Sequence, residues 1–135
     1  MKASEFINTF AFATLAAMNG RGQYACMDVD LEDIYQEIFF YLPRIRCKDG
    51  FSISVQVNNG NYCSSENGTR TFGYEWQEVE WGFPSEDIDE KKYNAESSPT
   101  TETVGGYVEI GLIDELIEEH GGLDLMATLT KAYEK

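Results

Sequence analysis

The sequence predicts an α+β fold in which a small antiparallel sheet packs against N- and C-terminal helices. Three observations support this fold class. Apolar residues recur at helical spacing near both ends of the chain, they alternate with polar residues in the middle, and Asp-Gly and Asn-Gly pairs mark turns in the alternating region. A chain of 135 residues with 42% hydrophobic residues is typical of one packed domain, so we expect residues 1–135 to form a single domain.

The first predicted element is a helix with Ser4 as its N-cap and a left-handed stop at Asn19-Gly20. One side of this helix carries the residues that recur at helical spacing and that we expect to face inward, which are Phe6, Ile7, Phe10, Ala13, Thr14, Ala17 and Met18. The stretch is interrupted by polar residues, so we expect no membrane-spanning segment here or elsewhere.

A second helix is predicted from Leu31 to Tyr41, although its last four residues would also suit a strand. Asp28, Asp30 and Asp33 have the chemistry to bind Ca²⁺ or Mg²⁺. The segment lacks the glycine and the further ligands of an EF-hand, whereas Asp30 and Asp33 lie at the spacing of a capping box. We therefore assign these acids to helix capping.

From Arg44 the period of the apolar residues changes to two, which predicts a hairpin of residues 44–47 and 51–57 around Asp49-Gly50. The inward face of its second strand would consist of Phe51, Ile53, Val55 and Val57. A short strand at Tyr62-Cys63 and a long strand from Thr71 to Phe83 are expected to complete the sheet.

The last part of the chain combines a long connection with two helices. Residues 84–106 are polar, and a connection of this length is often functional or mobile. Tyr107 to Glu109 would add an edge strand, and the helix that follows would stop at Gly121-Gly122. Its expected inward residues are Ile110, Ile113, Leu116 and Ile117. Asp124 would cap a short last helix with Leu125, Leu129, Ala132 and Tyr133 inward.

Charge separates the two halves of the chain. The sequence has 24 acidic and 10 basic residues, a net charge of −14, and residues 75–90 and 96–119 each hold seven acids and no Lys or Arg. Such a protein repels nucleic acid and anionic membranes and attracts basic surfaces. We therefore expect it to bind a basic protein, although acidity also serves solubility alone.

Two segments of the acidic half suggest where a partner binds. In the long strand, Val79, Trp81 and Phe83 share one parity and are expected to face the core, whereas Trp76 shares the parity of Glu78 and Glu80. An aromatic residue beside acids is typical of a protein-binding face unless another segment covers it. In the helix after Tyr107, acids four residues apart repel each other by about 0.2–0.5 kcal/mol per pair without a local cation to offset them. The expected partner-binding residues are Glu75, Trp76, Glu78, Glu80, Glu86, Asp87, Asp89, Glu90, Asp114, Glu115, Glu118 and Glu119.

Catalytic and cofactor motifs are not evident. His120 is the only histidine, and its position at a predicted helix end favours an interaction with the helix dipole over catalysis. No nucleophile elbow, phosphate-binding glycine loop or second histidine for a zinc site is present, so we expect no catalytic residue, cofactor or metal. The odd number of cysteines, Cys26, Cys47 and Cys63, predicts reduced thiols and a cytoplasmic location.

Three segments within residues 79–122, a stretch of about a third of the chain, resemble small accessory proteins of phages and prophages. They are Val79 to Ser85, Pro99 to Val108, and the helix that ends at His120-Gly121-Gly122. This resemblance implies a setting shared with anti-CRISPR and anti-restriction inhibitors, several of which mimic DNA. It carries over no functional residues.

The combined expectation is a non-enzymatic inhibitor that presents the acids of residues 75–119 to a basic, nucleic-acid-binding host protein. It would bind neither nucleic acid nor a membrane itself, and its oligomeric state is left open. One alternative is a small enzyme with an unrecognised carboxylate site. The other is an assembly or structural protein of a virion.

Overall fold

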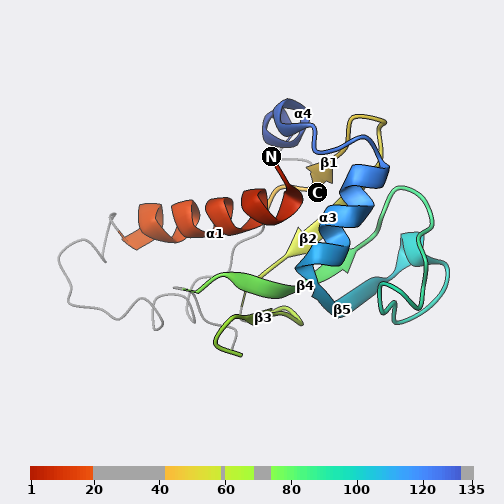
Figure 1. Cartoon of the computed structure of the whole chain (residues 1–135), viewed down its shortest axis with the longest axis horizontal. Coiled ribbons are helices and arrows are strands. Elements are labelled where there is room, and N and C mark those ends of the chain that lie inside the picture. The colour runs from red at the N-terminus through yellow and green to blue at the C-terminus, as the bar shows by residue number, and fades with distance from the viewer. Residues whose placement is uncertain (20–41, 59, 69–73, 132–135) are drawn as a thin grey trace.

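The computed structural model describes residues 1–19, 42–58, 60–68 and 74–131, and it has the predicted α+β architecture (Figure 1). Helices α1 (Ala3–Asn19) and α3 (Ile110–Glu119) pack against each other, and α3 also packs on the sheet. Helix α4 (Leu125–Thr130) lies next to the first strand. A single hydrophobic core joins both α1 and α3 to the strands.

The sheet has five antiparallel strands, β1 (Ile45–Arg46), β2 (Ser52–Gln56), β3 (Ser64–Ser65), β4 (Trp76–Gly82) and β5 (Val104–Glu109). Strand β4 is central, because it pairs with β2, β3 and β5. The short strand predicted at Tyr62-Cys63 is wrong by two residues, since β3 begins at Ser64.

The predicted hairpin is confirmed. Strand β1 pairs with β2 through Ile45 and Ile53, and Gly50 in the turn has a φ of +97°, a conformation that glycine adopts without strain. All four residues predicted to face inward from the second strand of this hairpin are buried. Alternation of apolar and polar residues therefore identified the core face of this strand correctly.

Helix α1 is confirmed, but its first turn differs from the prediction. The helix begins at Ala3, so Ser4 lies inside it, and the Ser4 backbone N–H donates a hydrogen bond of 2.8 Å to the Asp114 carboxylate of α3. Phe6 and Ile7 are buried as expected. The Asn8 side chain accepts a 2.7 Å hydrogen bond from the Trp76 backbone N–H, which ties α1 to the start of β4.

Several predictions fall outside the described residues. They are the helix at 31–41, the capping acids Asp28, Asp30 and Asp33, the third cysteine Cys26, the start of the long strand at 71–73, and residues Ala132 and Tyr133. Cys47 and Cys63 are buried free thiols, and burial, with Asp49 adding a smaller effect, raises the pKa of Cys47 to about 12. Among the described helices, none combines the length and apolarity that crossing a membrane requires.

The placement of the aromatic residues of β4 has to be corrected. Trp76 was expected on the open face with Glu78 and Glu80, but its side chain is 1% exposed. The pairing with β3 shifts by one residue between Glu78 and Trp76, so Gln77 forms a bulge that turns Trp76 to the core side. Phe83, expected in the core, is 53% exposed, because it follows the last residue of β4 with a φ of +50°.

Strand β5 contains a second irregularity, which brings its backbone against an indole. Its pairing with β4 shifts between Val79 and Trp81, at the point where Tyr107 has a φ of +52°. Nearby, a Cβ atom on Gly105 would lie 2.4 Å from Nε1 of Trp81, so only glycine fits there. The indole of Trp81 donates a 2.7 Å hydrogen bond to the Tyr93 carbonyl.

The connection between β4 and β5 is part of the packed structure. The Ser85 backbone N–H donates to the Ser52 carbonyl at 2.8 Å, and the Glu96 N–H donates to the Val104 carbonyl at 2.9 Å. Tyr93 is buried in the core, and a 3₁₀ turn, η2 (Thr100–Glu102), leads into β5. These contacts fix the acids of this connection relative to the sheet.

The predicted end of α3 and the predicted cap of α4 are confirmed, whereas the inward side predicted for α4 at Leu125 and Leu129 is wrong. Helix α3 ends as predicted before Gly121 and Gly122, which both have positive φ, and Asp124 caps α4 by accepting a 2.9 Å hydrogen bond from the Ala127 N–H. In α4, however, Leu125 and Leu129 are exposed and Thr128 is buried. Thr128 faces inward because its hydroxyl accepts a hydrogen bond of 3.0 Å from the Arg46 N–H.

Candidate partner-binding surface

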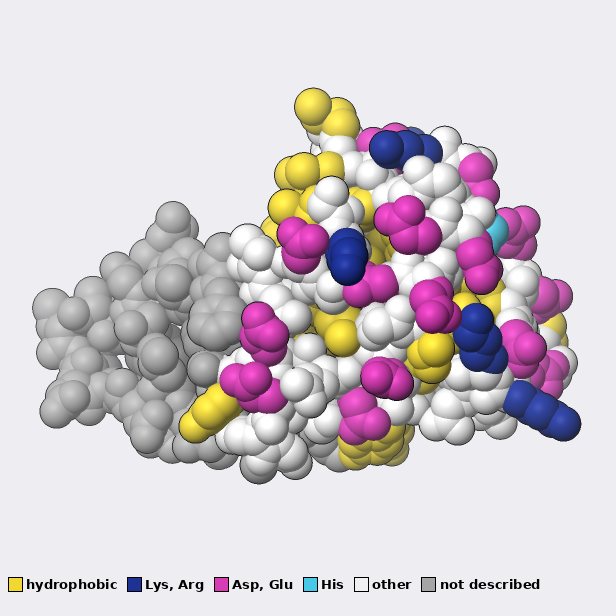
Figure 2. Space-filling view, in the orientation of Figure 1, with side chains coloured by type: hydrophobic (Ala, Val, Ile, Leu, Met, Phe, Trp, Pro, Cys, Tyr) yellow, Lys and Arg dark blue, Asp and Glu magenta, His cyan; other side chains and the backbone are white. Residues whose placement is uncertain are grey.

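Helix α3 separates apolar from acidic residues along its length. Ile113, Leu116 and Ile117 are buried against α1 and the sheet, whereas Glu118 and Glu119 are exposed. Figure 2 shows Asp and Glu side chains gathered over the part of the molecule formed by α3 and the neighbouring strands, with a few Lys and Arg among them. The helix therefore presents its carboxylates to solvent.

Two neighbouring depressions connect the helix acids with acids of the sheet. One is lined by Lys2, Gly111, Asp114, Glu115, Glu118 and Glu119, and the other by Gln77, Glu78, Glu109, Ile110 and Gly111. Both include Gly111, so they meet at the start of α3. Their six acids, Glu78, Glu109, Asp114, Glu115, Glu118 and Glu119, are called the α3 surface below.

Part of the repulsion predicted within α3 is offset by contacts with other segments. Asp114 accepts the Ser4 N–H in the first turn of α1, where the positive end of the helix dipole favours an anion. Glu115 lies 3.5 Å from the Lys92 ammonium group. As predicted, no cation within the helix lies near these acids. The tertiary fold instead supplies the Ser4 N–H for Asp114 and the Lys92 ammonium group for Glu115.

The two strand acids act as hydrogen-bond acceptors. Glu78 accepts the Ser64 hydroxyl at 2.7 Å, and Glu80 accepts the Tyr62 backbone N–H at 2.7 Å and the Asn61 amide at 3.3 Å. Glu80 thereby fixes the loop between β2 and β3. Its main contribution is structural, and it does not line the α3 surface.

Acids of the β4–β5 connection have similar internal partners. Asp87 accepts the Thr100 hydroxyl at 2.9 Å, and Asp89 accepts the backbone N–H groups of Lys91 and Lys92 at 3.0 Å each. The hydrogen bond from the Lys92 backbone is the largest influence that lowers the pKa of Asp89. Glu75 and Glu90 are exposed and lie outside the depressions.

The aromatic residues next to the strand acids are tyrosines that the sequence analysis did not select. Tyr62 is 50% exposed and Tyr107 is 45% exposed, and their ring centroids lie 5.8 Å apart. Glu80 holds the backbone of Tyr62, as described above. Tyr62 and Tyr107, and not Trp76, are therefore exposed aromatic residues in the region of Glu80. In the sequence, the signal of an unusual backbone there was the Gly105-Gly106 pair before Tyr107.

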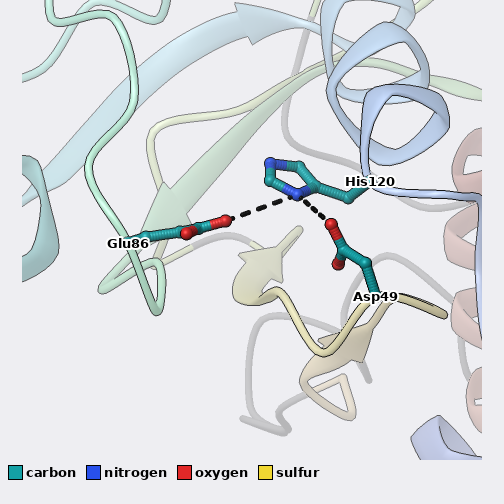
Figure 3. A group of neighbouring side chains, drawn as sticks. All are labelled: Asp49, Glu86 and His120. Atoms are coloured by element: carbon teal, nitrogen blue, oxygen red, sulfur yellow. Dashed lines mark hydrogen bonds and ion pairs between the residues drawn. The ribbon is translucent and has the colours of Figure 1, made fainter.

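His120 lies at the C-terminal end of α3, as predicted, and makes contacts that the sequence did not indicate (Figure 3). Its Nδ1 atom lies 2.7 Å from Oδ2 of Asp49 and 3.5 Å from Oε1 of Glu86. The imidazole stacks on Phe51, with 3.9 Å between ring centroids and an interplanar angle of 9°. Asp49 is 71 residues away in sequence, so no spacing pattern could have identified this group.

Comparison of the chain with protein-family models, with curated proteins and with solved structures finds no match. The interpretation of the α3 surface therefore depends on its own geometry and charge.

Proposed function

We propose that this chain is a non-enzymatic acidic binding protein whose α3 surface binds the basic, nucleic-acid-binding face of a host protein and blocks it. This role is the one expected of a phage-encoded inhibitor of a defence complex. The partner's cations would take the place of the counterions that surround the exposed carboxylates.

The observation that carries this proposal is the convergence of six acids from β4, β5 and α3 on two adjoining depressions. Among the described residues, Lys2 is the one basic residue that lines them. Glu118 and Glu119 lie in the last turn of α3, where the negative end of the helix dipole adds to their potential. Such an arrangement costs free energy in the isolated protein and is relieved when a cationic surface approaches.

A charge-reversal experiment tests this proposal. Glu118→Lys with Glu119→Lys changes the α3 surface, and Glu66→Lys with Glu102→Lys changes the net charge equally at exposed residues outside it. Both proteins would be used to capture partners from nuclease-treated bacterial lysate, and the affinity of each captured protein would then be measured. We expect the α3 pair to weaken binding at least about tenfold, equivalent to about 1.4 kcal/mol, and the other pair to weaken it far less.

Two further measurements separate a specific surface from general acidity. Binding should weaken steeply as salt increases, because exposed charges are screened over about 8–10 Å at physiological ionic strength. Duplex DNA should compete with the chain for the captured protein. Equal losses from both double variants, or binding that persists at high salt and is unaffected by DNA, would contradict the proposal.

A further inference from the structure

Three potential ligand atoms converge at the C-terminal end of α3, outside the α3 surface. Nδ1 of His120 and one carboxylate oxygen each of Asp49 and Glu86 all lie within 4.8 Å of one another. The three residues come from the β1–β2 turn, the connection after β4 and the end of α3, and their side chains point toward a common centre (Figure 3). We propose that Asp49, Glu86 and His120 bind a divalent transition-metal ion, with Zn²⁺ as the best fit.

The fold holds Asp49 and His120 in place before any metal binds. Oδ1 of Asp49 accepts the Phe51 backbone N–H at 2.8 Å, which directs Oδ2 toward the imidazole. The stacking on Phe51 fixes the plane of the His120 ring. Backbone hydrogen bonds from Asp49 to His120 and from Lys48 to Gly122 fasten the turn to the end of the helix. Such supporting contacts are what orient ligands in established metal sites.

Glu86 is held through the residues on both sides of it. The Ser85 backbone N–H donates to the Ser52 carbonyl at 2.8 Å, and the Ser85 hydroxyl accepts the Ser52 N–H at 2.9 Å. On the other side, Asp87 accepts the Thr100 hydroxyl. The backbone at Glu86 is therefore fixed, and only its exposed side chain has to settle around an ion.

One of the two distances from His120 already suits tetrahedral coordination of a small ion. Bonds of about 2.0–2.1 Å to nitrogen and oxygen place neighbouring ligand atoms roughly 3.3 Å apart. The 3.5 Å between His120 and Glu86 agrees with this spacing, whereas the 2.7 Å between His120 and Asp49 is a hydrogen-bond distance that has to lengthen. A metal would replace the proton shared by this pair, and water would complete the coordination.

The chemistry of the donors selects the type of ion. One neutral imidazole and two carboxylates balance the charge of a divalent cation. Imidazole suits Zn²⁺ and neighbouring transition metals, whereas Ca²⁺ and Mg²⁺ prefer sites made of oxygen alone. The sequence has one histidine, so no zinc site was expected from it. In the folded chain, Asp49 and Glu86, which are distant from His120 in sequence, supply the further ligands.

Metal titration of the tag-free, chelator-treated protein tests this site. Calorimetry with Zn²⁺ should show one bound ion, Co²⁺ should give the visible absorption of a coordinated ion, and Zn²⁺ should raise the melting temperature because it binds the folded state. Millimolar Ca²⁺ should not compete. His120→Gln should abolish binding, and Glu86→Gln should weaken it by about tenfold or more.

The matched control is Glu90→Gln, which removes the same charge from an exposed residue of the same connection and should leave metal binding unchanged. Circular dichroism would establish that each variant is folded. Failure of the wild type to bind, displacement of Zn²⁺ by Ca²⁺, or equal weakening by Glu86→Gln and Glu90→Gln would each overturn the proposal. The first result would leave His120 as an ion-paired residue, and the last would assign the ions to general surface acidity.

Discussion

The acids of β4 and the acids of α3 belong to the same acidic half of the chain, yet they are used differently. Glu78 and Glu80 are half-buried and accept hydrogen bonds from Ser64, Tyr62 and Asn61. Glu118 and Glu119 are exposed at the end of a helix that buries its other side. Nearby donors decide which role an acid in this half of the chain has: where a loop presents N–H or O–H groups, the carboxylate accepts them and becomes part of the fold.

Glu80 is the acid whose removal should destabilise the fold most. Replacing Glu80 by Ala removes the acceptor of the Tyr62 backbone N–H, and we expect the free energy of unfolding to fall by about 1–2 kcal/mol. Glu118→Ala should change it by less than about 0.5 kcal/mol. Urea unfolding of both variants measures the difference, and Glu80→Gln, which keeps an acceptor, should lose less than Glu80→Ala. Equal losses of unfolding free energy in Glu80→Ala and Glu118→Ala would contradict the different roles assigned to these two acids.

Asp114 differs from Glu118 and Glu119, because it accepts a backbone hydrogen bond from another segment. Asp114→Ala should lower the free energy of unfolding by about 1 kcal/mol, since the Ser4 N–H in the first turn of α1 loses its acceptor. Asp114→Asn retains an oxygen acceptor and should recover part of this loss. Hydrogen exchange at the Ser4 amide provides a local measurement, and unchanged protection in Asp114→Ala would contradict the assigned contact.

The smallest effect concerns Asp89 and depends on pH. Its pKa is lowered from 3.8 in the folded protein, so its ionised form stabilises the fold above about pH 4, and this contribution is lost as the pH falls through the lowered pKa. Asp89→Asn should therefore be less stable than the wild type near neutral pH and should approach it in acid. Thermal melts at about pH 6 and about pH 3 compare the two proteins. A stability difference between Asp89→Asn and the wild type that grows in acid would contradict this pH dependence.

Local patterns in the sequence predicted the elements whose core contacts repeat regularly. The alternation from Phe51 to Val57 and the helical spacing of Ile113, Leu116 and Ile117 both identified buried faces correctly. The cap at Asp124 and the stop at Gly121 were also predictable, because each depends on a few adjacent residues. Fold class followed from these elements together.

Features that depend on irregular pairing or on distant residues were not predictable. One extra residue in β4 moved Trp76 from the expected surface to the core, and a hydrogen bond to Arg46 turned Thr128 inward in a helix too short to show a period. Of the twelve predicted partner-binding residues, the depressions bring together Glu78 and the four acids of α3. The contacts of Glu80 and Asp87 depend on donors that only the fold places beside them.

The hydrogen bonds of α1 have a consequence for how the chain acquires its structure during synthesis. Asn8 finds its partner 68 residues later, and Ser4 finds its partner 110 residues later. Contacts this distant in sequence slow folding, because a long loop has to close before they can form. As the chain leaves the ribosome, the apolar side of α1 has to wait for β4 and then α3. During that interval its apolar side chains remain uncovered, and exposed apolar surface of this kind makes incomplete chains prone to aggregation.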